Sequence, residues 1–278
     1  MEEQKKNVAL VTGASSGIGR AIGVRLLALG YEVYGIGRSF SESTAPAERS
    51  SSGAGEGGLA GLSASGRDDF SELPPFRLCE SDHFHPVVFD LQDTKKLPAL
   101  VKSLQAEWKQ AGWRFTLLVN NAGTAYYGLH EELRAEHISE MVRVNLEVPM
   151  ILTQQLLRVL KQNHGSIVNI SSVTALSSNP HGVAYGATKA GLLSFSRSLF
   201  DEARKYGVRV TTILPDMTDT RLYRHADFQA DPALDAHLEP EDVVDALVYA
   251  LTTREGSCVP EIVLRPQLHR IQKKAPKS

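Results

Sequence analysis

The feature that most constrains the fold is a short apolar run that leads directly into a glycine-rich turn. Residues 8–11 are typical of a buried strand, and Gly13, Gly17 and Gly19 follow them. Apolar residues then recur at helical spacing over 21–29. Glycine lets a chain turn sharply and approach a ligand closely, and a helix that starts there directs backbone N–H groups at an anion. The run predicts a strand, a phosphate-binding turn and a helix, although a turn without a ligand has the same pattern.

Strand and helix patterns continue to alternate along the chain. Further strands are expected at 32–36, 86–89, 115–119, 166–170, 208–214 and 261–264, and helices at 17–29, 95–109, 136–162, 184–206 and 241–251. This alternation is typical of a parallel sheet with helices on both faces, in which ligands bind at the carboxyl ends of the strands. With 278 residues, 42% of them hydrophobic, the chain fits a single α/β domain over 1–278.

Charge and cysteine content exclude several classes of protein. The net charge of −2 predicts no broad basic surface for nucleic acid or for an anionic membrane. Cys79 and Cys258 are too few for a disulfide framework or a cysteine-based zinc cluster, and they fit a reducing compartment. The pair His83-x-His85 is by itself weak evidence for a metal site, so we expect these histidines to be solvated and predict no metal site. No apolar run approaches the ~20 residues of a membrane span, which leads us to expect a soluble cytoplasmic protein.

A second motif, Tyr185-x-x-x-Lys189, lies near the start of the expected helix 184–206. A spacing of four places both side chains on one helix face. An ammonium group near a tyrosine favours the phenolate and lowers its pKa toward the working pH, as general acid–base catalysis requires. Ser172 follows the expected strand 166–170, where a hydroxyl faces the ligand crevice and can hydrogen-bond a substrate oxygen. Ser171 competes for this role, and a serine that only turns the chain is the alternative for both.

Taken together, these motifs resemble the short-chain dehydrogenase/reductase family, in its shorter single-domain branch. The residues that carry the resemblance are Thr12, the glycine turn, Asn120-Asn121-Ala122-Gly123, Asn145, Ser172 and Tyr185-x-x-x-Lys189. It covers about residues 7–264. The resemblance implies a Rossmann-like doubly wound parallel sheet, a nicotinamide cofactor, and reversible hydride transfer between the cofactor C4 and a carbonyl or alcohol carbon.

The resemblance also implies a role for each matched residue. Tyr185 is expected to be the general acid in reduction and the general base in oxidation. Lys189 is expected to lower the pKa of Tyr185 and to bind the nicotinamide ribose. Ser172 is expected to orient the substrate oxygen, and Asn145 to hold a water that connects Lys189 to solvent. The expected cofactor-binding residues are Gly13, Ser15, Ser16, Gly17, Ile18, Gly19, Arg38, Asp90, Leu91, Asn121, Ala122, Gly123, Tyr185, Lys189, Pro215, Thr218 and Thr220.

The end of the second expected strand indicates which nicotinamide cofactor is preferred. An acidic residue at this point holds the ribose 2′-hydroxyl of NAD, whereas an arginine accommodates the 2′-phosphate of NADP. The chain has Arg38 here and no acid at Ile36, Gly37 or Ser39. NADP(H) is therefore favoured over NAD(H). Arg20, in the first turn of the first helix, either adds to phosphate binding or faces solvent.

Three segments depart from the family pattern or from the alternation. Asp216 follows Pro215 where the family usually has glycine, and aspartate tolerates a left-handed backbone there. Its carboxylate either disfavours acidic substrates or points away. Residues 39–82 contain ten serines and six glycines, so we expect a flexible insertion, either a surface loop or a lid over the adenosine end of the cofactor. Residues 267–278 are expected to be a basic tail, with a frayed end from Lys273 to Lys277.

The sequence thus predicts an NADP-dependent oxidoreductase that acts on a small-molecule carbonyl or alcohol. The substrate pocket is expected within 124–127, 173–181 and 221–237. Leu192, Phe195 and Leu199 form a stripe that fits either core packing or association as a homodimer or homotetramer. The alternative function is a non-catalytic NADP-binding sensor or scaffold on the same fold. The sequence does not identify the substrate.

Overall fold

The computed structural model describes residues 5–40, 78–268 and 270–274, and its main element is a seven-stranded parallel sheet. The sheet order is β3-β2-β1-β4-β5-β6-β8. These strands are β1 (Asn7–Thr12), β2 (Glu32–Gly37), β3 (Phe84–Val88), β4 (Arg114–Asn120), β5 (Ser166–Ile170), β6 (Arg209–Pro215) and β8 (Glu261–Leu264). All seven expected strands are present. The direction of winding reverses between β1 and β4, which opens a crevice at the carboxyl ends of these strands.

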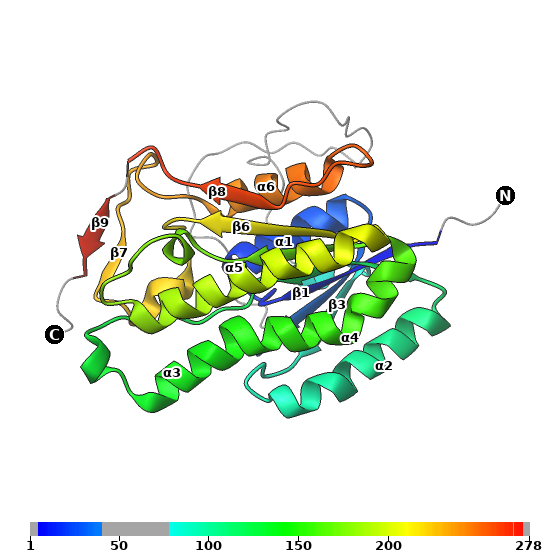
Figure 1. Cartoon of the computed structure of the whole chain (residues 1–278), viewed down its shortest axis with the longest axis horizontal. Helices are drawn as coiled ribbons and strands as arrows, with labels where there is room; N and C mark the ends of the chain where they lie inside the picture. The colour runs from blue at the N-terminus through cyan, green and yellow to red at the C-terminus, as the bar shows by residue number, and fades with distance from the viewer. Residues whose placement is uncertain (1–4, 41–77, 269, 275–278) are drawn as a thin grey trace.

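Helices cover both faces of the sheet (Figure 1). The helices are α1 (Gly17–Ala28) and α6 (Pro240–Thr252) on one face, and α2 (Leu97–Gln110), α4 (Val148–Asn163) and α5 (Val183–Ala203) on the other. Successive side chains of β1 enter opposite cores, Val8 and Leu10 on the α2–α4–α5 side and Ala9 and Val11 on the α1–α6 side. This arrangement confirms the Rossmann-like α/β fold.

The long helix expected at 136–162 is interrupted near its middle. Helix α3 (Ala135–Val142) passes into a wider π-helical turn, η5 (Arg143–Glu147), before α4 begins. Pro149 explains the change, because proline has no N–H to donate to the carbonyl of Asn145 four residues earlier. Such single-turn π segments are frequent at functional sites. The turn places Asn145 where its backbone carbonyl is not committed to a regular α-helical bond.

A chain of buried polar side chains ties α5 to the centre of the sheet. Asn120 in β4 donates from Nδ2 to Oδ1 of Asn169 in β5 at 2.8 Å, and Asn169 donates from Nδ2 to Oγ of Ser196 in α5 at 2.8 Å. Ser196 in turn donates a hydrogen bond from Oγ to the carbonyl of Leu192 at 2.7 Å. Buried polar groups are costly unless they are hydrogen-bonded, so this chain of bonds favours one position of α5 against the sheet.

The amino-terminal end of the sheet holds a buried carboxylate. Glu32, only 2% exposed, accepts a hydrogen bond at Oε1 from Nζ of Lys6 at 2.6 Å. Its Oε1 also lies 2.9 Å from Nδ1 of His83, and its Oε2 lies 2.9 Å from Nε2 of His85. The expectation that these histidines are simply solvated is therefore wrong. Within the described ranges, no group of three or more His, Cys, Asp or Glu side chains has an arrangement that could hold a metal ion.

The expected insertion and the expected tail both have ends that belong to the folded core. Phe40 packs edge-on against Phe84 with ring centroids 5.6 Å apart, and Leu78 in the short helix η2 (Leu78–Glu80) is buried. The remainder of the insertion, 41–77, lies outside the described residues. Near the other end of the chain, β9 (Ile271–Lys273) pairs antiparallel with β7 (Phe228–Ala230). The prediction of a frayed end at 273–277 is thus wrong for Lys273, because this residue pairs with Phe228 in a two-stranded sheet.

The apolar stripe on α5 faces inward. Leu192 and Leu199 are buried and Phe195 packs against the core, so core packing accounts for the stripe.

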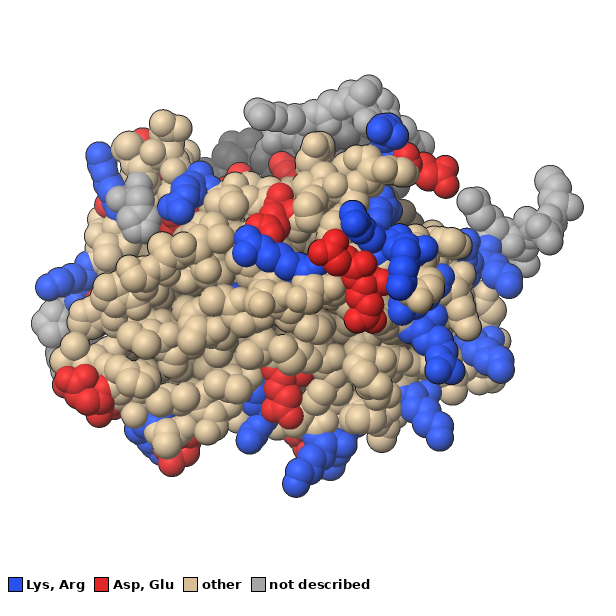
Figure 2. Space-filling view, in the orientation of Figure 1, with Lys and Arg blue, Asp and Glu red and all other residues tan. Residues whose placement is uncertain are grey.

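The face in Figure 2 carries Lys and Arg with Asp and Glu among them, mainly around a central area with little charge. Among the helices in the described part of the chain, none is both long and apolar enough to cross a membrane.

Candidate active site

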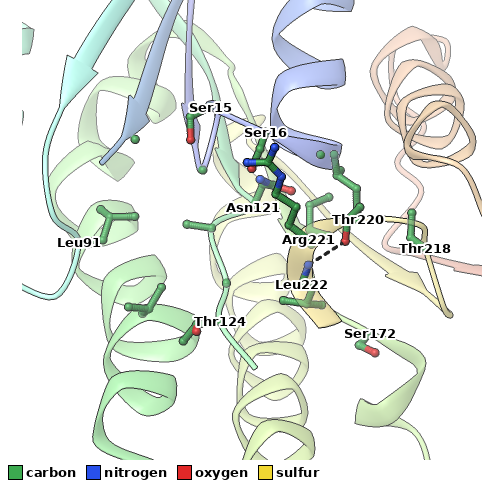
Figure 3. Close-up of a pocket in the computed structure, with 18 of the residues that line it drawn as sticks. Ser15, Ser16, Leu91, Asn121, Thr124, Ser172, Thr218, Thr220, Arg221 and Leu222 are labelled. Carbon is green, nitrogen blue, oxygen red and sulfur yellow. Dashed lines mark hydrogen bonds between the residues drawn. The ribbon is translucent and has the colours of Figure 1, made fainter. Parts of the chain in front are cut away.

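One cleft at the carboxyl ends of the central strands gathers most of the expected site residues (Figure 3). The expected residues that line it are Gly13, Ser15, Ser16, Gly17, Ile18, Arg38, Asp90, Leu91, Asn121, Ala122, Gly123, Ser172, Tyr185, Lys189, Pro215, Thr218 and Thr220. Two expected residues, Gly19 and Asn145, are buried and do not line the cleft. Residues more than 200 positions apart in the sequence therefore meet at one surface.

The glycine turn has the geometry of an anion cradle. Gly13 and Gly17 have φ of +71° and +52°, a left-handed backbone that side chains rarely adopt. At Gly19 an added Cβ would lie 2.8 Å from the carbonyl carbon of Gly13, so only glycine allows α1 to start this close to β1. Helix α1 begins without a side-chain cap and without an acidic residue in its first turn. Its N-terminal N–H groups and dipole are therefore available to a phosphate at the cleft.

The floor of the cleft is formed by the end of β4, which is bonded to the end of β1. Thr12 accepts hydrogen bonds at Oγ1 from the backbone N–H of Asn121 at 3.0 Å and of Ala122 at 2.9 Å. The side chain of Asn121 donates from Nδ2 to the carbonyl of Thr12 at 2.9 Å. Thr12 and Asn121 thus fix the path of residues 121–123 below the ligand position. The side-chain amide of Asn121 is used for this structural purpose.

Tyr185 and Ser172 both line the cleft. Tyr185 is 4% exposed. Burial raises the pKa of Tyr185 to about 12, and the polar side chain of Ser172 opposes that rise. The phenol is therefore protonated near neutral pH, which is the state required of a proton donor.

Lys189 lies one helical turn after Tyr185 and is also buried. Its Nζ donates to the carbonyl of Ile170 at 2.8 Å and lies 5.8 Å from the centroid of the Tyr185 ring. Burial lowers the pKa of Lys189 to about 8. The expectation that Lys189 lowers the pKa of Tyr185 does not describe the net shift, because burial of the phenol has the larger effect.

Ser171 and Ser172 differ in their hydrogen bonds. Ser171 donates from Oγ to the backbone carbonyl of Lys189 at 3.0 Å, so its hydroxyl serves to hold α5. Ser172 accepts at Oγ from the N–H of Thr174 at 3.2 Å, a bond that leaves its own hydroxyl proton free to be donated. This difference favours Ser172 over Ser171 as the hydroxyl beside a reacting oxygen.

Asn145 is fully buried and connects three parts of the site. Its Nδ2 donates to the carbonyl of Thr124 at 2.9 Å and to Oγ1 of Thr188 at 3.1 Å, and its Oδ1 accepts from the N–H of Thr124 at 2.8 Å. A Cβ added to Gly123 would contact both Oδ1 of Asn145 at 3.5 Å and Nζ of Lys189 at 3.6 Å. The amide of Asn145 and the ammonium of Lys189 therefore both lie close to Gly123.

The side chain of Asp216, in the loop after β6, is bonded within the protein. Oδ1 of Asp216 accepts from the N–H of Met217 at 2.8 Å, and Oδ2 of Asp216 lies 3.3 Å from a guanidinium nitrogen of Arg265. The non-glycine residues with positive φ in the described ranges are His164 and His181, so Asp216 needs no left-handed backbone. The ion pair with Arg265 offsets part of the carboxylate charge beside the cleft.

Some residues of the site were not singled out from the sequence. Glu140 lines the cleft and accepts a hydrogen bond at Oε2 from the hydroxyl of Tyr126 at 2.9 Å. Asn169 helps to hold α5, and its polar side chain inside an otherwise apolar strand was a signal for a buried role. Arg221, expected only as part of a longer substrate segment, extends toward Ser16 in Figure 3 and lines the same cleft.

Comparisons with known proteins identify the family of this chain. The short chain dehydrogenase family model matches residues 76–230, more than half of the chain. An uncharacterized oxidoreductase of Staphylococcus saprophyticus is 30% identical over 96% of this chain and 100% of its own length. The 3-oxoacyl-(acyl-carrier-protein) reductase of Escherichia coli is 30% identical over 78% of this chain and 75% of its own length.

Solved structures agree on the fold. An alcohol dehydrogenase from the archaeon Thermococcus sibiricus, complexed with 5-hydroxy-NADP, has a TM-score of 0.73 at 22% identity, over 96% of this chain and 99% of that one. Other solved neighbours are complexes with NADP or with NADH. The fold, the arrangement of the cleft and the family match lead to one conclusion: this chain belongs to the short-chain dehydrogenase family and is an oxidoreductase.

Proposed function

We propose that the protein is an NADP(H)-dependent oxidoreductase that transfers a hydride between the nicotinamide and a carbonyl or alcohol carbon. Its catalytic set is Ser172, Tyr185, Lys189 and Asn145. The observation that carries this proposal is that Ser172, Tyr185 and Lys189 line the same cleft as the glycine turn. A sensor or scaffold that only binds the dinucleotide has no need of a buried phenol and ammonium at that position.

The residues of the cleft fit the dinucleotide along its whole length. The glycine turn and the start of α1 would hold the pyrophosphate, because the turn cannot accept side chains and the helix end is uncapped. Asp90 and Leu91 would hold the adenine, Tyr185 and Lys189 the nicotinamide ribose, and Pro215, Thr218 and Thr220 the carboxamide. When bound, the cofactor supplies or accepts the hydride at C4 of its nicotinamide ring.

Proton transfer is the task of the buried side chains. In reduction, Tyr185 Oη donates its proton to the carbonyl oxygen as that oxygen gains negative charge, and the Ser172 hydroxyl donates a hydrogen bond to the same oxygen. The charged form of Lys189 stabilises the phenolate that remains on Tyr185. In oxidation the phenolate accepts the proton of the alcohol. The carbonyl of Asn145, which Pro149 leaves without its usual α-helical donor, would hold a water that exchanges protons with Lys189.

The preference for NADP(H) rests on the end of β2. Arg38 is exposed where β2 ends and lines the cleft, and neither Ile36, Gly37 nor Ser39 supplies a carboxylate. A guanidinium at this position binds a 2′-phosphate, whereas an acid would bind the 2′-hydroxyl. Family relatives include proteins solved with either cofactor, so this residue and not the fold supports the choice.

The experiment that tests the proposal is a panel of ketones, aldehydes and keto-acids, assayed by loss of NADPH absorbance and repeated with NADH. We expect turnover of at least one carbonyl, with a higher kcat/KM for NADPH. If the protein binds NADPH tightly but oxidises it with no carbonyl of the panel, the result would instead support the sensor or scaffold. Equal kcat/KM for both cofactors would contradict the assignment of Arg38.

A further inference from the structure

Residues close to the C-terminus take part in the architecture of the cleft. Strand β9 pairs with β7 so that Lys273 lies opposite Phe228 and Ile271 opposite Ala230. Figure 1 shows this two-stranded sheet beyond the carboxyl ends of β6 and β8. The residues that follow β6, Asp216 and Thr218, line the cleft. A segment that the sequence suggested would fray is therefore attached to the part of the chain that borders the site.

Lys274 connects this end of the chain to the segment after β6 through three hydrogen bonds. Its Nζ donates to the carbonyls of Tyr223 at 2.6 Å and of Ala226 at 3.0 Å, and its N–H donates to the carbonyl of Asp227 at 2.7 Å. The first two carbonyls lie at the end of the short helix η8 (Arg221–His225), and that of Tyr223 also accepts the N–H of Ala226 at 3.1 Å. A cation at a helix C-terminus is favourable. Lys274 thus caps η8 from almost fifty residues further along the chain.

Tyr223 and Phe228, in and just after η8, pack with Tyr127 beside the proposed proton donor Tyr185. The ring of Tyr127 lies 6.0 Å from that of Tyr223 and 5.0 Å from that of Phe228, and Tyr223 and Phe228 are 5.6 Å apart. We call Tyr127, Tyr223 and Phe228 the aromatic wall. Its Tyr127 ring is 5.9 Å from the ring of Tyr185, so the aromatic wall adjoins the reacting position.

The cofactor side of the same loop is anchored separately. Leu238 donates its N–H to the carbonyl of Met217 at 2.8 Å and accepts at its own carbonyl from the N–H of Asp219 at 2.8 Å. These bonds hold Thr218, a proposed cofactor contact, independently of Lys274. Loss of the Lys274 ammonium is therefore expected to move Tyr223 and Phe228 more than Thr218.

From this arrangement we propose that Lys274 is a positioning residue for the substrate, and that the aromatic wall receives a planar apolar group of a carbonyl substrate. Aromatic rings bind flat apolar groups through large buried area and through stacked or edge-on contacts. The neighbouring carboxylates have partners, Arg265 for Asp216 and the Tyr126 hydroxyl for Glu140, which suits a substrate part without charge. The inference rests on the proposed function and names the substrate class of that site.

The test compares Lys274→Met with two matched variants. Methionine keeps most of the aliphatic stem and removes the ammonium, Lys274→Arg restores a cationic donor, and Lys273→Met makes the same change at the exposed neighbouring position in β9. Binding of acetophenone to the complex with NADP⁺ is measured by calorimetry, which needs no turnover, and the KM for acetophenone is measured with NADPH. A thermal unfolding scan shows that each variant is folded.

We expect Lys274→Met to weaken acetophenone binding and to raise its KM by about tenfold, within the loss of up to ~100-fold that a remote misplacement of about 1 Å causes. The kcat and the dissociation constant of NADPH should change by less than about twofold, since the proton donor and Thr218 have their own anchors. Lys274→Arg should recover most of the loss, and Lys273→Met should match the wild type. Acetophenone should also bind more tightly than 2-octanone, which has the same number of carbons without a ring.

The outcomes separate this inference from the proposed function. If acetophenone is reduced but Lys274→Met leaves its KM and its binding unchanged, the positioning role is wrong. If 2-octanone binds as tightly as acetophenone, the assignment of a planar group to the aromatic wall is wrong. If acetophenone binds the NADP⁺ complex and Lys274→Met weakens that binding while no carbonyl is ever reduced, the inference stands and the proposed function fails.

Discussion

The close approach of α1 to β1 can be tested by replacing Gly19 with alanine. The new Cβ would lie 2.8 Å from the carbonyl carbon of Gly13, and closer still to the oxygen of that carbonyl and to Nδ2 of Asn121. Carbon atoms in contact are normally about 3.5–4.0 Å apart, so the start of α1 must move by about 0.7–1.2 Å. Overpacking of this kind costs about 1–3 kcal/mol, and the higher helix propensity of alanine returns about 1 kcal/mol. We expect Gly19→Ala to lower the free energy of unfolding by at most about 2 kcal/mol.

The larger effect should be on cofactor binding. Hydrogen bonds to a charged group contribute about 1.5–3 kcal/mol each, and loss of one by displacement of the helix end weakens binding about tenfold to a hundredfold. The control is Gly23→Ala, four residues later in the same helix, where the new Cβ meets only the flexible side chain of Leu78 at 3.3 Å. Calorimetric titration with NADPH and a thermal unfolding scan measure both quantities. NADPH affinity in Gly19→Ala equal to that of the wild type, or an equal loss in Gly23→Ala, would refute the reasoning.

Three further predictions concern charge. Arg38→Asp should erase or invert the preference for NADPH in kcat/KM, and an unchanged ratio of the two cofactors would show that another residue reads the ribose. Burial lowers the pKa of Lys189 to about 8, so its ammonium is charged below that pH and neutral above it. The kcat/KM for reduction should therefore stay constant up to about pH 8 and then fall. Lys189→Arg should move that fall to higher pH, and a flat wild-type profile to about pH 10 would contradict the role of the cation. At Glu32, burial raises the pKa of the carboxyl, but hydrogen bonds from Lys6, His85 and His83 outweigh it and lower the pKa. The carboxylate therefore stabilises the fold above the unfolded pKa of about 4.5, and this stability is lost as the pH falls through the folded value. Glu32→Gln should lower the free energy of unfolding at pH 7 by about 1.5–3 kcal/mol, and should flatten the acid dependence seen in denaturant titrations; an equally steep acid dependence would show that other groups cause it.

Local patterns were enough to predict the sheet and most of the cleft. Each buried strand is a short apolar run, and the carboxyl ends of parallel strands meet at one edge, so Gly13, Asn121 and Ser172 could be placed together before any coordinates were known. The boundaries of β5 and β8 match the expected ranges, because each run ends sharply against polar residues or proline.

Other features depend on partners that the sequence does not place. Glu32 opens a strand, and nothing in its neighbourhood along the chain shows that His83, His85 and Lys6 surround it in the fold. Strand β9 is similar: residues 271–273 have little apolar character to mark a strand, and their partner β7 lies about forty residues away. Short strands are decided by such tertiary pairing more than by local propensity.

The direction of the Tyr185 shift shows a further limit. The spacing to Lys189 places the two groups on one helix face, but it says nothing about how deeply the phenol is buried. In the structure, the effect of burial on the pKa of Tyr185 outweighs the opposing effect of the Ser172 side chain, and the Lys189 ammonium donates a hydrogen bond to the carbonyl of Ile170. A pKa depends on the full surroundings of a group, which become visible only when distant segments are assembled.

The measurement that tests the central claim most directly is the turnover of Tyr185→Phe, compared with Tyr206→Phe, an exposed tyrosine after α5. With the best substrate from the carbonyl panel, Tyr185→Phe should still bind NADPH and should lose activity by about 10²–10⁴-fold, as expected when an acid–base group is removed. Tyr206→Phe should change neither quantity. Wild-type turnover in Tyr185→Phe would contradict the account, because the proton would then have to come from another group.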